Sequence, residues 1–208
     1  MKEIEDYIIE STYSFTSSDG LEINRRIGMI VHNLFTCRRG FAGNVVEIGA
    51  GLGNTTIHFL KTACSYNKKV IVIDPFEDFD AGVFGGYLYD EFLTTIESEV
   101  ESKQECLILY REPSQEKGMK NKLIEHLPIA FAFVDGIQDT VENVLSDLVL
   151  MAELDTKVIC VDDVNSNNPK RKKIVSSAVF EFIKNHPYNM VENINPKAHI
   201  REAYIIKE

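Results

Sequence analysis

Short runs of β-branched and other apolar residues alternate along the chain with longer segments whose apolar residues recur at helical spacing. The short runs predict strands over residues 45–48, 70–74, 106–110, 128–134 and 158–163. The longer segments predict helices over residues 21–36, 54–66, 89–100, 140–153 and 169–185. Two further strands are expected over 188–193 and 198–206, and the short turn between them allows antiparallel pairing only.

The alternation of strand and helix predicts an α/β fold with a mostly parallel sheet, one antiparallel strand and flanking helices. We expect one domain over residues 1–208, because a chain of this length can bury a substantial core. Residues 41–208 are expected to form that core, and residues 1–40 an N-terminal arm and helix. The arm fits a lid over a ligand and a simple surface extension equally well.

A glycine-rich turn follows the first predicted strand. Glu47 lies near the strand's end, and Gly49, Gly51 and Gly53 follow before a helix opens. Glycines lack Cβ atoms, so a ligand can approach the backbone at a helix N-terminus. A dinucleotide site needs the spacing Gly-x-Gly-x-x-Gly, whereas here the third glycine comes one position early. An acid at Glu47 suits a ligand with a cationic end, such as the α-ammonium group of S-adenosylmethionine.

Polar residues also follow the other predicted strands. Asp74 ends the second strand, where nucleotide-binding folds place an acid on ribose hydroxyls. Ser114 follows the third strand, where it either caps a helix running towards Leu127 or offers polar atoms to an adenine. Asp135 follows the fourth strand, and an acidic pair follows the fifth. Because ligands in such sheets bind beyond the carboxyl ends of the strands, we expect these groups to meet at one site.

Three carboxylates, those of Asp135, Asp162 and Asp163, are expected to lie close together at the ends of neighbouring strands. Like charges raise one another's pKa, so the cluster needs compensation. Mg²⁺ bound by these acids and by two substrate oxygens would supply it and would acidify a hydroxyl group. The alternative is that Asp162 and Asp163 cap backbone groups of the following turn while Asp135 contacts the ligand. The sequence leaves both interpretations open.

Composition narrows the partners and the compartment. The formal net charge of −10 argues against a nucleic-acid partner, although residues 170–173 form a local basic patch. No apolar run approaches the roughly 20 residues of a membrane helix, and the acidic start lacks the apolar core of a signal peptide. Four scattered cysteines without a CxxC pair indicate a reduced, cytoplasmic compartment. A small-molecule substrate is expected, and a homodimer stays open.

Several stretches carry a family resemblance. The pattern E-x-G-x-G-x-G at residues 47–53 resembles the first motif of class I S-adenosylmethionine-dependent methyltransferases. The segment 133–148 and the run Val161-Asp162-Asp163-Val164 are similar to small-molecule O-methyltransferases of the catechol and macrolide-sugar type. Ser114-Gln115-Glu116 is similar to the adenine-side segment of the catechol enzymes. The resemblance runs from about residue 40 to the end and implies a Rossmann-like, seven-stranded methyltransferase fold.

The resemblance also implies roles for particular residues. Glu47 would serve the methionine ammonium and Asp74 the ribose, and Ser114 and Gln115 would lie by the adenine. The implied cofactor-binding set is Glu47, Gly49, Ala50, Gly51, Gly53, Asn54, Thr55, Asp74, Pro75, Ser114, Gln115, Asp135 and Gly136. The implied metal-binding set is Asp135, Asp162 and Asp163, and the catalytic candidates are Asp135 and Asp163.

One position departs from the family pattern. These families often carry a His or a Lys shortly after the first metal-binding aspartate, whereas Gln138 lies three residues after Asp135 here. An amide takes no proton near neutral pH, so the usual base is missing. Acidification by the metal, a carboxylate (Asp135 or Asp163), or a residue of the arm or a loop would have to replace it.

The sequence therefore predicts methyl transfer from S-adenosylmethionine to a hydroxyl group of a small molecule, with Mg²⁺ as an assisting ion. Gln138 motivates an alternative, an S-adenosylmethionine-binding protein that methylates nitrogen, acts on a protein or has no methyltransferase activity. A nicotinamide-dependent oxidoreductase is a further alternative, which the glycine spacing disfavours.

Overall fold

The computed structural model describes residues 2–13, 20–36, 41–76, 88–100, 105–191 and 201–208. The helices are α1 (Lys2–Tyr13), α2 (Gly20–Thr36), α3 (Asn54–Ala63), α4 (Leu88–Val100), α5 (Met119–Ile124), α6 (Val141–Glu153) and α7 (Pro169–Asn185), and a 3-10 turn, η1 (Cys64–Tyr66), follows α3. The strands are β1 (Asn44–Ile48), β2 (Val70–Ile73), β3 (Leu107–Tyr110), β4 (Ile129–Val134), β5 (Val158–Val161), β6 (Tyr188–Met190) and β7 (Ala203–Lys207).

The strands form one seven-stranded sheet in the order β3-β2-β1-β4-β5-β7-β6. β1 pairs in parallel with β2 and β4, and β4 pairs in parallel with β5. β7 runs antiparallel to both of its neighbours, β5 and β6. The predicted fold, a mostly parallel seven-stranded sheet with one antiparallel strand, is confirmed.

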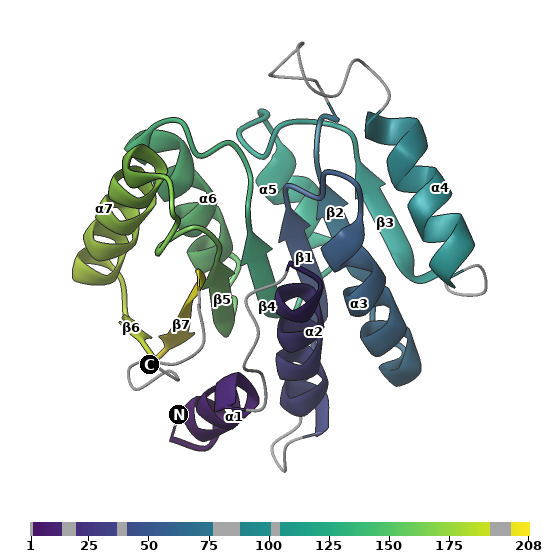
Figure 1. Ribbon diagram of the computed structural model, residues 1–208, viewed down its shortest axis with the longest axis horizontal. Coiled ribbons are helices and arrows are strands. Elements are labelled where there is room, and N and C mark those ends of the chain that lie inside the picture. The colour runs from purple at the N-terminus through teal and green to yellow at the C-terminus, as the bar shows by residue number, and fades with distance from the viewer. Residues whose placement is uncertain (1, 14–19, 37–40, 77–87, 101–104, 192–200) are drawn as a thin grey trace.

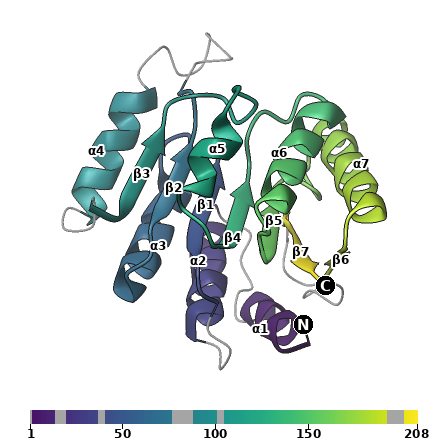
Figure 2. The ribbon, with the colours of Figure 1, turned by 180° about the vertical axis from the view of Figure 1, so that it is seen from behind.

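Helices cover both faces of the sheet, with α1 to α4 on one face and α5 to α7 on the other (Figures 1 and 2). Side chains of a strand alternate between its two faces. Val45 and Val72 accordingly join the core beneath α2 and α3, whereas Val46 and Ile71 join the core beneath α5 and α6. Burial on both faces explains why the central strands read as continuous apolar runs in the sequence.

Most predicted boundaries lie close to the observed ones, and α7 begins at Pro169 with Asn168 as its N-cap, as the sequence indicates. Three ends differ. Helix α5 begins after Gly118, so Ser114 does not cap it. The N-cap of α3 is Gly53 in a left-handed conformation, without a side-chain cap. The last two strands are shorter than predicted, and the turn expected between them lies outside the described residues.

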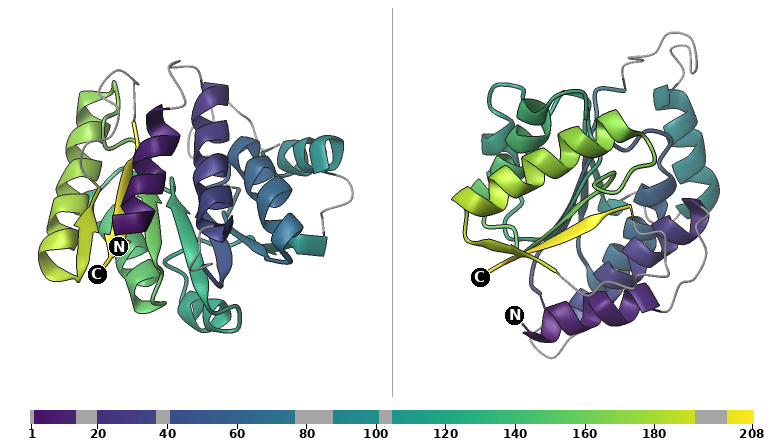
Figure 3. Two further views of the ribbon diagram at one scale, coloured as in Figure 1. Left: turned by 90° about the horizontal axis from the view of Figure 1, so that it is seen from below. Right: turned by 60° about the vertical axis from the view of Figure 1, so that its left-hand side comes forward.

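Helix α1 packs beside α2 on one face of the sheet (Figure 3). Ile4 and Ile8 join the core of α2, and the Asn33 Nδ2 atom donates to the Ser11 hydroxyl oxygen at 2.8 Å. In Figure 1, α1 lies at the end of the sheet opposite the carboxyl ends of the parallel strands. The described part of the arm therefore packs as a core helix, and a lid role for the rest falls outside the described residues.

The longest described helices, α2 and α7, have 17 residues each. Within the described residues, no helix combines the length and the apolar character that crossing a membrane requires.

Candidate functional site

The turn between β1 and α3 depends on its glycines. Gly49, Gly51 and Gly53 have φ angles of +83°, +51° and +81°, which L-residues with side chains rarely adopt. A Cβ atom at Gly49 would lie 2.2 Å from the carbonyl oxygen of Asp135, so β1 and β4 can approach this closely only with glycine there. A Cβ atom at Gly51 would meet no atom of the described residues within 4 Å, so the described part of the turn is open on that side.

Asp74, at the end of β2, holds this turn with its carboxylate. Its Oδ2 atom accepts the N–H groups of Ala50 at 2.7 Å and Gly51 at 3.0 Å, and its Oδ1 atom accepts that of Phe76 at 2.6 Å. A carboxylate offers about four acceptor sites, so Asp74 keeps capacity for a ligand hydroxyl group. The predicted ribose acid is therefore also the group that organises the glycine turn.

A cavity of about 790 Å³ lies over the carboxyl ends of β1, β2 and β4. Small-molecule sites typically occupy roughly 300–1,000 Å³. The predicted cofactor residues in its lining are Gly49, Ala50, Gly51, Asn54, Thr55, Asp74, Pro75, Ser114, Gln115, Asp135 and Gly136. The lining residues outside the predicted set are Asn24, Ile48, Ile73, Leu88, Pro113, Ile137, Gln138, Asp139 and Arg171.

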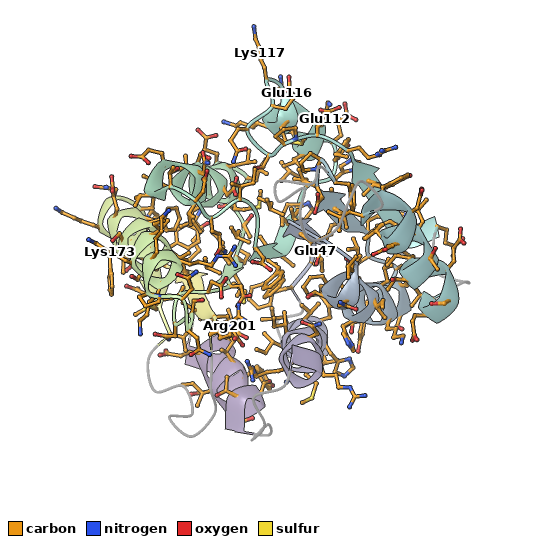
Figure 4. All side chains as sticks on the ribbon, turned by 45° about the horizontal axis from the view of Figure 1, so that its top comes forward. Glu47, Glu112, Glu116, Lys117, Lys173 and Arg201 are labelled. Carbon is orange, nitrogen blue, oxygen red and sulfur yellow. The ribbon has the colours of Figure 1, made fainter. Side chains whose placement is uncertain are left out.

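Glu47 and Gly53 were expected at the cofactor and lie outside this lining. The Glu47 side chain is fully buried between β1 and α3, where the Thr56 hydroxyl donates to its Oε2 atom at 2.6 Å. Its Oε1 atom has no hydrogen-bond partner among the described residues, and burial raises its pKa to about 8. Figure 4 shows Glu47 near the middle of the molecule. A direct contact between Glu47 and a ligand ammonium group does not fit this geometry.

Ser114 and Gln115 line the cavity and are held from behind by Asp147 of α6. The Ser114 hydroxyl donates to Asp147 Oδ1 at 2.5 Å, and Gln115 Nε2 donates to the same atom at 2.9 Å. Of the two roles expected for Ser114, helix capping is wrong, because its hydroxyl serves this network. Asp147 is buried, and burial raises its pKa to about 7.

The neighbouring ends of β4 and β5 bring three acids together, which we call the acid cluster: Asp135, Asp162 and Asp163. One carboxylate oxygen from each lies within 4.8 Å of the others. Asp135 lines the cavity, whereas Asp162 and Asp163 are buried behind it. Asp163 has a φ angle of +62°, a left-handed conformation that aspartate adopts more readily than most residues.

Two arginines bind the acid cluster. Arg171, in the first turn of α7, donates from Nη1 to Asp163 Oδ2 at 2.9 Å. Arg201, just before β7, donates from Nη2 to Asp163 Oδ1 and lies 3.5 Å from Asp162 Oδ2. Both oxygens of the Asp163 carboxylate, which is 1% exposed, are therefore engaged in ion pairs. The Asp163 side chain thus pairs with arginines, an arrangement that neither the metal-binding nor the turn-capping interpretation predicted.

Burial raises the pKa of two members of the acid cluster. At Asp135, burial and then the charges of Asp162 and Asp163 place the pKa well above its ordinary value. At Asp162, burial raises the pKa to about 6 against the opposing effect of Arg201. Of the three acids, only Asp135 lines the cavity, so it is the carboxyl group of the acid cluster that a ligand in the cavity could reach.

The predicted Mg²⁺ set, Asp135, Asp162 and Asp163, is assembled, and two arginines already balance part of its charge. Among the described contacts, Asp135 and the Oδ1 atom of Asp162 stay outside the arginine pairs, and that Oδ1 atom is buried without a hydrogen-bond partner there. To bind a divalent ion, Asp163 would have to give up an arginine pair, and the ion would be repelled by both guanidinium groups. The arrangement therefore does not fit a resident divalent ion.

Gln138 is buried at the cavity wall beside the acid cluster. Its Nε2 atom lies 3.4 Å from Asp135 Oδ1 and 3.4 Å from the main-chain oxygen of Asp162, at the long limit of a hydrogen bond. The amide thus donates towards Asp135 and takes no part as a base, as the sequence indicates.

Two polar residues of the cavity, in addition to Leu88 of α4, came from helices that the site prediction did not include. Asn24 of α2 accepts the Thr55 hydroxyl at 3.1 Å and so brings the N-terminal helix to the cavity edge. Nothing in the spacing of α2 signals this contact. Arg171 belongs to the basic run 170–173, and its place in the first turn after the N-cap Asn168 was the available signal.

The strand order, the glycine turn after β1 and the cavity over the strand ends define a class I methyltransferase fold. The sequence itself matches no protein-family model and no curated protein.

Solved structures share this fold. Cofactor-bound Rv0187 from MTB aligns with a TM-score of 0.62 at 13% identity, over 98% of this chain and 88% of that one. CalS11, a TDP-rhamnose 3′-O-methyltransferase of calicheamicin biosynthesis, aligns with 0.57 at 15% identity, over 99% and 93%. The S-adenosylhomocysteine-bound methyltransferase PaMTH1 of Podospora anserina aligns with 0.55 at 11% identity, over 98% and 88%. At identities this low, the alignments establish a common fold and nothing more.

Proposed function

We propose that this protein is a methyltransferase that transfers a methyl group from S-adenosylmethionine to a hydroxyl group of a small molecule. One observation carries the proposal: the glycine turn, Asp74, Ser114 and Asp135 border a single cavity at the carboxyl edge of the sheet. Solved structures of the same fold support it, since one contains S-adenosylhomocysteine and another is a sugar O-methyltransferase.

The cofactor is proposed to lie along the glycine turn. Asp74 would accept the ribose hydroxyl groups, and Ser114 and Gln115, fixed by Asp147, would border the adenine. The open side of Gly51 leaves the backbone accessible to the methionine part. The sulfonium methyl group would then face the acid cluster, where Asp135 lines the cavity.

In the proposed reaction, the acceptor oxygen attacks the methyl carbon, the bond from carbon to sulfur breaks, and sulfur keeps the electron pair. The products are the methyl ether and S-adenosylhomocysteine, and the hydroxyl proton passes to the Asp135 carboxylate. The sulfonium group supplies a good leaving group, so the protein contributes mainly positioning and proton removal.

Gln138 supports a second candidate function. The protein would then bind the cofactor and methylate nitrogen or a protein, or it would transfer no methyl group. The Gln138 amide occupies the place where the resembling families carry a base. Of the acid cluster, only Asp135 lines the cavity and could accept the proton there.

Two measurements separate these functions. Calorimetry with S-adenosylhomocysteine should show saturable binding to one site per chain, and NAD should show none. Labelled S-adenosylmethionine is then offered with a panel of hydroxylated and amine-bearing small molecules. Transfer to hydroxyl groups supports the proposal, tight binding without such transfer supports the second candidate, and absence of cofactor binding refutes both.

A further inference from the structure

The positive charges that pair with the acid cluster come from two distant parts of the chain. Arg171 comes from α7 and Arg201 from the segment before β7, and both bind Asp163. We infer that these two guanidinium groups replace a divalent cation at the ends of β4 and β5, the end of the cavity where the acceptor would bind. Their role in methyl transfer rests on the proposed function, whereas the exclusion of a divalent ion can be measured without it.

Asp163 is positioned for two guanidinium groups. Its side chain is almost completely buried, and each oxygen accepts from a different arginine. Its left-handed backbone conformation is the third unusual feature at this position. An ion-paired carboxylate this deeply buried is strongly coupled to its partners, because removing either partner leaves an uncompensated charge.

Arg201 is fixed in place by a second buried network. The Glu202 side chain accepts the Arg201 main-chain N–H at 3.1 Å through Oε2. Through Oε1 it accepts Arg26 Nε at 2.8 Å and the Tyr204 hydroxyl at 2.9 Å. Arg26 and Glu202 have no exposed side-chain surface, so α2 anchors the segment that carries Arg201 (Figure 4).

Arg171 connects the acid cluster with the cavity. It is the one cationic side chain in the described lining, and half of its side chain is exposed. Only its Nη1 atom is engaged, with Asp163, among the described contacts. A guanidinium group carries five N–H donors, so Arg171 keeps donors for an oxygen of the acceptor. A divalent ion would orient that oxygen by coordination, and Arg171 can orient it by hydrogen bonds.

The decisive experiment titrates MgCl₂ calorimetrically into the full-length protein saturated with S-adenosylhomocysteine. We expect no saturable Mg²⁺ binding to the wild-type protein. The double variant Arg171→Gln, Arg201→Gln should bind about one Mg²⁺ per chain, with an affinity gain of at least roughly tenfold. The double variant Lys172→Gln, Lys173→Gln is the matched control, because it also removes two positive charges, from exposed positions of α7, and should gain nothing. Lys173 is labelled in Figure 4.

Where the double variant fails to fold, Arg171→Gln alone frees one oxygen of Asp163 and should show a weaker gain of Mg²⁺ binding. Saturable binding of Mg²⁺ to the wild-type protein, lost in Asp163→Asn, would overturn the inference. Absence of any gain in a folded arginine variant would overturn it as well. The titration reports on the acid cluster alone, and failure of the proposed function would appear separately as absent cofactor binding or absent methyl transfer.

Discussion

The two ends of the cavity are built in different ways. At the end formed by β1 and β2, backbone N–H groups of a glycine turn are organised by one carboxylate, that of Asp74. At the end formed by β4 and β5, three acids and two arginines meet, with Asp162 and Asp163 buried and the arginines partly exposed. The first end depends on backbone shape and the second on a balance of side-chain charge.

This difference predicts how each end responds to mutation. A glycine that has a positive φ and lies against another strand tolerates no side chain. Single substitutions at the end formed by β1 and β2, which we call the cofactor end, should therefore cause large losses of stability. Substitutions in the acid cluster and its two arginines should instead change the pH dependence, the binding of ions and the transfer to the acceptor, while the cofactor stays bound. The predictions below test that division.

The largest effect is expected for Gly49→Ala. A methyl group there would lie 2.2 Å from the Asp135 carbonyl oxygen, in a backbone conformation that itself disfavours alanine by about 1–2 kcal/mol. We expect a loss of more than about 4 kcal/mol in the free energy of unfolding, which removes most of the stability of a typical domain. Urea unfolding measures it.

Gly51→Ala is the matched control, since it adds the same methyl group at positive φ where nothing lies within 4 Å. We expect it to lower the free energy of unfolding by about 1 kcal/mol. Equal losses at Gly49 and Gly51 would show that the close approach of β4 is unimportant.

The next largest effect is a pH-dependent one at Glu47. Its pKa is about 8 in the folded chain and near 4.5 in the unfolded chain, so the folded state keeps a proton that the unfolded state releases. The stabilising effect is complete below pH 4.5 and is lost as the pH rises towards 8. Glu47→Gln removes this pH-dependent loss of stability. We expect the variant and the wild-type protein to have similar free energies of unfolding at pH 4.5. At pH 9 the variant should be more stable by on the order of 4 kcal/mol.

Urea unfolding of both proteins at several pH values measures this difference, and other titrating groups cancel because they are common to both. A constant difference from pH 4.5 to pH 9 would mean that Glu47 does not bind the extra proton. The Thr56 hydroxyl can still donate to the oxygen of the glutamine, so the variant keeps the observed hydrogen bond.

The fold and the cofactor end were largely predictable because their signals are local in the sequence. Apolar runs gave the central strands, and the glycine spacing placed the turn directly after β1. Asp74 and Ser114 followed from the rule that ligands lie at the carboxyl ends of parallel strands. Each inference needed only a short segment and the sheet order.

The charge balance was not predictable, because it depends on side chains far apart in the chain. Arg201 and Asp163 are separated by 38 positions, and no pattern joins them. Asp147 reaches Ser114 across 33 positions in the same way. For Glu47 two local signals disagree: the turn motif predicts a contact with the ligand, whereas strand alternation puts Glu47 on the same face as Val45, towards α3.

A smaller effect is expected for Asp74→Ala, measured as the affinity for S-adenosylhomocysteine. The change leaves three N–H groups without their acceptor and removes the proposed ribose partner. We expect affinity to fall by roughly 100-fold, equivalent to about 3 kcal/mol. Asp74→Asn keeps one acceptor oxygen and should fall by roughly tenfold. Unchanged affinity in both variants would remove Asp74 from the site.

The smallest effect on cofactor binding is expected for Asp163→Asn. Asparagine keeps the size of the side chain and tolerates the left-handed conformation, so the change removes charge with little change of shape. Asp163 does not line the cavity, and its partners are Arg171 and Arg201. The affinity for S-adenosylhomocysteine should therefore change less than about twofold. Methyl transfer should fall roughly 100-fold, because Arg171 loses the anchor that positions it at the acceptor.

Calorimetry and a transfer assay on the same Asp163→Asn preparation separate the two quantities. Parallel loss of cofactor affinity and transfer would mean that the two ends act as one unit, and the division between backbone shape and charge balance would be wrong. Independent responses would place acceptor positioning at the ends of β4 and β5, where buried charge can be altered while the glycine turn keeps its geometry.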